Sequence, residues 1–154
     1  MSIGKGLARF SIEYVHSRML SGIDRIEFVV EERSNKRFQC YLNSDRLHLF
    51  LRKGVSCVCC GIKGEYYLAE LCGNPSPHLN LYSICGRLMT KDHIFPVSKG
   101  GSNRFHNLQT MCTKCNARKS NNIENLLFST RNFRSTKDME EAIKEGVLVE
   151  GINA

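Results

Sequence analysis

The sequence predicts a small α+β fold with a metal-stabilised core, and three observations support this. The 154 residues suffice for one modest hydrophobic core. Strand-like and helix-like segments alternate along the chain without an internal repeat. Two Cys-x-x-Cys pairs, "CVCC" and "CTKC", bracket the segment richest in loop signals. We therefore expect a core at 51–122, a mixed N-terminal accessory region at 1–50 and a helical C-terminal tail at 123–154.

The N-terminal accessory region is expected to contain a β-hairpin and a short helix. The segments "RIEFVVEE" (25–32) and "KRFQCYL" (36–42) predict two strands joined across "RSN". The segment "NSDRLHLFLRKG" (43–54) predicts a helix that Ser44 caps and Gly54 ends. For "EYYLAEL" (65–71) the periodicity fits a strand or a short helix equally.

The core is expected to run strand, loop, strand, helix. "LYSICGRLMTKDHI" (81–94) alternates as one strand, and "FPVSKGGSNRFH" (95–106) predicts a long loop. "NLQTM" then returns as a strand that begins at Asn107. "TKCNARKSNN" predicts a helix with Thr113 as its N-cap. Beyond it, "IENLLFSTRNF" and "TKDMEEAIKEG" predict two helices of the tail.

The cysteine spacing predicts a structural zinc site. The chain has no apolar run of about 18 residues and its N-terminus lacks the pattern of a secretion signal, so we expect an intracellular, cytoplasmic protein and no membrane contact. Thiols stay reduced there, and Cys-x-x-Cys pairs then typically bind zinc rather than form disulfides. Four thiolates would close the tetrahedral shell and leave no place for a reacting water. The expected ligands are Cys57, Cys60, Cys112 and Cys115.

Four further cysteines leave alternatives open. Cys59 could take the place of Cys60, although Cys57 and Cys60 match the spacing of the second pair. Cys40, Cys72 and Cys85 are expected to be ordinary apolar packing residues.

The positive charge of the chain is concentrated on the expected core. The net charge is +7, and residues 86–134 hold nine Lys or Arg against Asp92 and Glu124. A basic segment of this kind favours a polyanionic partner, usually nucleic acid. The alternative is a solvated basic face that only aids solubility.

A closed zinc site does not account for Asp92, His93, Asn107 and Asn116. Hydrolysis of a phosphodiester needs an activated water, relief of charge on the phosphate and protonation of the leaving oxygen. A neutral histidine suits the first task, and a divalent cation held by carboxylate and amide oxygens suits the others. Taken singly, each of these residues is more often structural.

The segments "DHIFPVSKGG", "NLQTMC" and "CTKCNARK", with "CVCC" upstream, resemble the HNH endonucleases. The resemblance covers residues 57–121 and implies a ββα-metal (His-Me) finger with a four-Cys zinc. It implies that His93 is the general base and that Asn107 bonds the loop backbone and so orients His93. Asn116 stands where many members have a final His, which makes this an H-N-N variant. Asp92 and Asn116 would hold Mg²⁺ or Mn²⁺.

Asp92 and His93 pose a geometric condition, because neighbouring side chains on a regular strand point to opposite faces. They can serve one site only if the strand ends or bulges there, which Pro96 favours.

His106 is expected to be a loop residue near the DNA. Phosphate contacts are expected from the basic residues of the loop and helix, with a solvated face as the alternative: Lys99, Arg104, Lys114, Arg118 and Lys119.

The function expected from these features is a metal-dependent endonuclease that nicks DNA or cuts both strands. Double-strand cleavage would require a homodimer, a second event or a bent substrate. A phage or homing endonuclease, acting in a bacterial or phage-infected cell, is the leading role, with a restriction enzyme or a packaging-associated nicking enzyme as the alternative roles. The alternative is a non-catalytic, zinc-stabilised DNA-binding module. Such a module would have no need for Asp92, His93 and Asn116 together.

Overall fold

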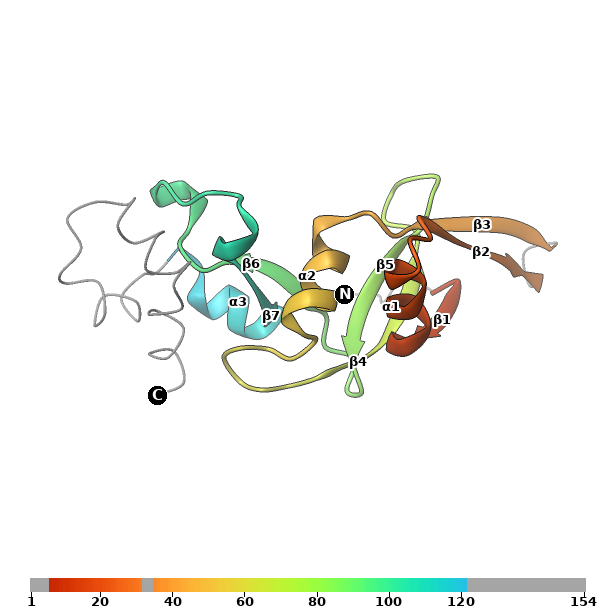
Figure 1. Cartoon of the computed structure of the whole chain (residues 1–154). Coiled ribbons are helices and arrows are strands. Elements are labelled where there is room, and N and C mark those ends of the chain that lie inside the picture. The colour runs from red at the N-terminus through yellow and green to blue at the C-terminus, as the bar shows by residue number, and fades with distance from the viewer. Residues whose placement is uncertain (1–5, 32–34, 122–154) are drawn as a thin grey trace. The chain divides into compact units, whose positions relative to one another are not determined.

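The computed structural model describes residues 6–31 and 35–121 and has mixed α and β structure (Figure 1). It divides into two compact units. Of the described residues, the N-terminal unit comprises those up to Val55 together with Lys63–Met89, and the Cys-rich unit comprises Ser56–Ile62 together with residues 90–121. The two helices predicted within 123–154 lie outside the described residues. In the described part of the chain, no helix has both the length and the apolar character needed to cross a membrane.

The N-terminal unit is built on a three-stranded antiparallel sheet in the order β1–β4–β5. The strands are β1 (Ala8–Ser11), β4 (Gly64–Glu70) and β5 (His78–Ser83). Helix α1 (Ile12–Leu20) begins at Ser11, whose hydroxyl accepts a bond from the Tyr14 amide over 3.1 Å. It contributes the fully buried Val15 to a core that includes Tyr67 and Leu81. The segment "EYYLAEL", undecided from periodicity, therefore lies mainly in a strand.

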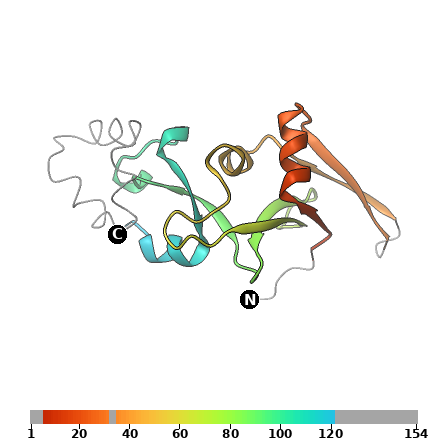
Figure 2. The ribbon, with the colours of Figure 1, turned by 60° about the horizontal axis from the view of Figure 1, so that its bottom comes forward.

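The predicted hairpin and helix of the N-terminal region are both present. Strands β2 (Arg25–Val30) and β3 (Lys36–Tyr41) pair antiparallel and extend away from the three-stranded sheet in both views (Figures 1 and 2). Residues 32–34, which cover the end of the first predicted strand and most of the predicted turn, lie outside the described residues. Helix α2 (Asp45–Lys53) begins after Ser44, whose hydroxyl accepts from the Leu47 amide. It ends at Gly54, with a φ of +95° that glycine adopts readily.

In the Cys-rich unit, strands β6 (Met89–His93) and β7 (Leu108–Cys112) pair, and helix α3 (Thr113–Lys119) follows β7 directly. The bond from the Ile94 amide to the Asn107 carbonyl and the bond from the Thr90 hydroxyl to the Met111 carbonyl fit an antiparallel register. In both views α3 lies next to this strand pair (Figures 1 and 2). The loop between the strands contains two 3₁₀ turns, η2 (Val97–Lys99) and η3 (Phe105–Asn107).

Three local predictions in this region are wrong. The single strand expected at 81–94 is two strands, β5 and β6, because the chain turns at Gly86, which has a φ of +74°. Helix α3 has Cys112 rather than Thr113 at its N-cap, and Thr113 is its first helical residue. Asn107 ends η3, so the return strand begins one residue later, at Leu108.

Candidate active site

Four cysteine side chains converge in the Cys-rich unit. The sulfur atoms of Cys57, Cys60, Cys112 and Cys115 all lie within 4.8 Å of one another. Those of Cys60 and Cys112 are 3.8 Å apart. A tetrahedral zinc with bonds of about 2.3 Å would place its sulfur ligands about 3.8 Å from each other, whereas a disulfide requires about 2.05 Å. The four-Cys cluster therefore has the dimensions of a zinc site.

The pKa values of two of these thiols are shifted in ways that favour a bound cation. Burial raises the pKa of Cys112, but hydrogen bonds from the Cys115 backbone and from the thiols of Cys115, Cys60 and Cys57 outweigh burial and lower that pKa to about 7. Burial and the neighbouring thiols raise the pKa of Cys115. The Cys112 thiol therefore ionises readily, whereas burial and the neighbouring thiols oppose ionisation of Cys115. A bound divalent cation removes this penalty, because it stabilises all the thiolates at once.

The remaining cysteines differ in their surroundings. Cys59 is exposed and is not among the four gathered sulfur atoms, so Cys60 completes the set. Cys40 is fully buried, and burial raises its pKa to about 12, as for an apolar packing residue. The same prediction is wrong for Cys72 and Cys85, which are exposed. Cys72 follows the end of β4, and Cys85 lies in the turn between β5 and β6.

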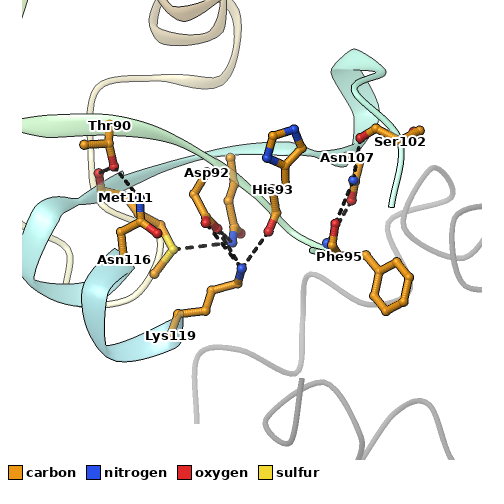
Figure 3. Close-up of polar contacts among 10 residues, drawn as sticks. Thr90, Asp92, His93, Phe95, Ser102, Asn107, Met111, Asn116 and Lys119 are labelled. Atoms are coloured by element: carbon orange, nitrogen blue, oxygen red, sulfur yellow. Dashed lines mark hydrogen bonds and ion pairs between the residues drawn. The ribbon is translucent and has the colours of Figure 1, made fainter. Parts of the chain in front are cut away.

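Asp92 is a buried carboxylate on β6, with 7% of its surface exposed. Its Oδ2 accepts a hydrogen bond of 2.7 Å from the Gln109 side-chain amide on the paired strand β7. The Lys119 ammonium, from the last residue of α3, lies 3.0 Å from the same oxygen and 3.3 Å from Oδ1. Figure 3 shows the Lys119 side chain reaching toward Asp92 and the His93 backbone.

His93 is the last residue of β6, and the chain bends at the two residues that follow. The strand therefore ends at His93. This meets the condition under which the neighbouring side chains of Asp92 and His93 can serve one site. The Nε2 atom of His93 lies 2.8 Å from the Asn103 side-chain oxygen. Because that oxygen only accepts, Nε2 carries the proton and the neutral ring has its lone pair on Nδ1.

Asn107 is fully buried and bonds the backbone of the loop that follows His93 (Figure 3). Its side-chain oxygen accepts from the Phe95 amide over 2.9 Å, and its Nδ2 donates to the carbonyls of Phe95 at 3.0 Å and Ser102 at 2.7 Å. Gly101 completes this arrangement, since a Cβ there would lie only 2.1 Å from the Phe95 carbonyl oxygen. One buried side chain thus ties both ends of the 95–102 loop together.

Asn116, on α3, donates from its Nδ2 to the Thr90 hydroxyl over 3.1 Å. This bond occupies the amide nitrogen and leaves the amide oxygen as the atom that could bind a cation. Asn116 lines a pocket of about 350 Å³ with Asp92, His93 and Lys119. The structure therefore brings three of the residues predicted to act in catalysis, Asp92, His93 and Asn116, to one pocket, and Asn107 supports its loop.

A comparison with known families bears on this region. Residues 71–130 match the model of a family described as HNH endonuclease. Over these residues the chain is similar to the HNH endonucleases. No curated protein and no solved structure matches the chain. The match indicates a nuclease-type function with DNA as the substrate class, and it spans β6, β7 and α3 with the whole pocket.

The five basic residues predicted to contact phosphate fall into two groups. The Lys119 side chain is only 15% exposed and is engaged with Asp92. The other basic residues predicted to contact phosphate are exposed, on the loop and on α3: Lys99, Arg104, Lys114 and Arg118. His106 lies in η3 and does not line the pocket.

Gln109 and Asn103 are pocket-supporting residues of the HNH region that the sequence did not single out. Gln109 had no clear signal, because the burial of all five residues of its strand is a property of the fold and not of the sequence pattern. A buried amide needs a hydrogen-bond partner, and a carboxylate on the paired strand supplies it. Asn103 had no signal, since loops are rich in asparagine and its contact with His93 depends on how the loop folds.

Proposed function

We propose that this chain is a metal-dependent HNH endonuclease that hydrolyses phosphodiester bonds of DNA. The observation that carries the proposal is the pocket where Asp92, His93 and Asn116 meet at the end of β6 and on α3. A histidine base, a carboxylate and an amide oxygen within one open pocket are the parts that phosphodiester hydrolysis requires.

His93 is the proposed general base, and Nδ1 is the atom that takes the proton from water. The bond from Nε2–H to Asn103 supports this assignment, because it fixes the ring tautomer. Asn107 is a positioning residue in this scheme. It fixes the loop backbone that leaves His93, and so limits how far the imidazole can move from the reacting water.

Asp92 and Asn116 are the proposed ligands of the catalytic divalent cation. The donor set consists of a carboxylate and an amide oxygen, which favours hard ions such as Mg²⁺ or Mn²⁺ over Zn²⁺. Such an ion, when bound, supplies Lewis-acid stabilisation to the phosphate and its leaving oxygen. The burial of Asp92 and its bond to Gln109 support this role, because both hold the carboxylate in one orientation.

The four-Cys cluster is the proposed site of a structural zinc. Two ligands come from the 57–60 turn, one ends β7 and one lies in the first turn of α3. A zinc there would fasten the start of α3 to that turn and so fix the helix that presents Asn116. We propose that this zinc site, with β6, β7 and α3, forms a ββα-metal finger in its H-N-N variant.

The proposed DNA contacts are the exposed Lys99, Arg104, Lys114 and Arg118, which would position the phosphate backbone without reading bases. One pocket acts on one strand, so a single chain would nick, and cutting both strands would require a second copy or a second event. The proposed setting is the cytoplasm of a bacterial or phage-infected cell, where the chain serves as a phage or homing endonuclease.

The test uses supercoiled plasmid with the wild type, His93→Ala and His78→Ala, each with Mg²⁺, Mn²⁺ or EDTA. His78 is an exposed histidine outside the pocket and serves as the matched control. We expect metal-dependent nicking by the wild type and His78→Ala, and a loss of about 10² to 10⁴-fold in His93→Ala. DNA binding, measured by gel shift, should persist in all three proteins. Binding without nicking under any metal would instead establish the non-catalytic DNA-binding module.

A further inference from the structure

Lys119 occupies the oxygen-rich side of the pocket. Its ammonium lies 3.0 Å from Asp92 Oδ2, 3.3 Å from Asp92 Oδ1 and 2.6 Å from the carbonyl oxygen of His93 (Figure 3). An ammonium has three donors, so these three oxygens can satisfy all of them. Lys119 follows Asn116 by three residues on α3, and residues at this spacing share one helix face.

The ion pair between Lys119 and Asp92 is largely buried, and this burial makes the charge of Lys119 necessary for Asp92. The exposed fractions of the Lys119 and Asp92 side chains are 15% and 8%. A carboxylate this buried requires a counter-charge, because the cost of removing it from water is large. Gln109 is neutral and supplies one hydrogen bond but no charge. Among the groups that contact Asp92 in the described residues, Lys119 supplies the positive charge.

A divalent cation bound through Asp92 would need the same carboxylate oxygens. We propose that Lys119 is a built-in counter-cation of Asp92, and that it competes with the catalytic divalent ion for this carboxylate. This inference rests on the proposed function, in which Asp92 is a metal ligand. It assigns Lys119 a positioning role at Asp92 in place of the phosphate contact expected from the sequence. The apparent metal affinity is then lowered by the stability of the Lys119–Asp92 pair.

The competition predicts two opposite effects of removing the ammonium. Lys119→Met keeps a chain of similar length without the charge. We expect it to bind Mn²⁺ at least roughly tenfold more tightly than the wild type, because the competitor and its like charge are gone. In the absence of added divalent ion, Lys119→Met should melt at a lower temperature, because Asp92 remains buried without a counter-charge. Added Mn²⁺ should reduce the difference in melting temperature between Lys119→Met and the wild type.

The experiment measures Mn²⁺ binding to the full-length, zinc-loaded chain by calorimetry and by the electron paramagnetic resonance signal of free Mn²⁺. Lys63→Met is the matched control, because Lys63 is an exposed lysine that does not line the pocket. Lys119→Gln is a second variant, for use if Lys119→Met does not fold. Circular dichroism checks the folding of each protein.

The outcomes separate this inference from the proposed function. Tighter Mn²⁺ binding in the Lys119 variant, with Lys63→Met unchanged and binding lost in Asp92→Asn, supports the competition. Unchanged or weaker binding in the Lys119 variant, again with binding lost in Asp92→Asn, overturns the competition and leaves the proposed metal site intact. Wild-type affinity in Asp92→Asn overturns both.

Discussion

The side-chain amide of Gln109 donates a 2.7 Å hydrogen bond to the Asp92 carboxylate, between residues 17 positions apart on paired strands. Both residues are buried, with 6% and 7% of their surfaces exposed. Gln109→Met keeps a side chain of similar size and removes the donor. We expect the free energy of unfolding to fall by about 1–3 kcal/mol, since a buried charged acceptor loses a partner.

Urea denaturation followed by circular dichroism measures this change. Gln39→Met is the control, because Gln39 bonds the exposed Tyr41 hydroxyl and its loss should change the free energy of unfolding by no more than about 0.5 kcal/mol. Equal effects of the two substitutions would show that the Asp92 contact adds nothing to stability.

The four-Cys cluster predicts about one tightly bound zinc per chain. In Cys112→Ser we expect zinc to be lost and the Cys-rich unit to unfold at a lower temperature, because the sulfur of Cys112 lies within 4.8 Å of all the others. Elemental analysis of the purified protein and a thermal melt measure the two effects.

Two substitutions serve as controls for the zinc prediction. Cys59→Ser removes an exposed cysteine that is not among the four gathered sulfur atoms, and it should keep its zinc. His93→Ala should also keep its zinc, because the pocket and the cluster use different side chains. Loss of zinc from Cys59→Ser together with retention in Cys60→Ser would reverse the choice between these two cysteines.

His16 predicts a loss of stability in mild acid. Its Nε2 lies 2.9 Å from the Tyr67 hydroxyl, and burial lowers its pKa from the ordinary 6.5, with the charge of Glu13 opposing the shift. The folded state thus favours the neutral ring, whereas the unfolded chain takes up a proton near pH 6.5. Stability from this group is fully present above pH 6.5 and declines as the pH falls below it toward the folded-state pKa. His16→Gln should flatten the fall in melting temperature between pH 7 and pH 5. If the melting temperature of His16→Gln falls with pH as steeply as that of the wild type, groups other than His16 cause the fall.

The sequence predicted best those elements whose signals are local. Ser44 and Gly54 bracket α2 because a helix needs a side-chain cap at its start and tolerates a left-handed residue at its end. The Cys-x-x-Cys spacing likewise places two thiols on one turn. Alternation alone failed at 81–94, since it persists across a tight turn, and Gly86 was the signal that marked the break.

The supporting contacts of the pocket were beyond the reach of sequence patterns. The bond between Gln109 and Asp92 depends on the register of β6 against β7, and no periodicity along one strand sets the register between two. Lys119 resembled its exposed neighbours in the sequence, so a phosphate contact was expected. That Lys119 pairs with Asp92 depends on where α3 begins, because the start of the helix sets the face on which the Lys119 side chain lies.

The anchoring of the 95–102 loop has a consequence for variation in this domain. The Asn107 side chain and the close approach at Gly101 contact only backbone atoms of the loop, so these contacts do not depend on the side chains at its tip. Val97, Ser98 and Lys99 are exposed there. These three positions can therefore be varied while the main chain that leaves His93 is kept, which makes the tip a suitable place to randomise in a directed-evolution library for altered DNA affinity.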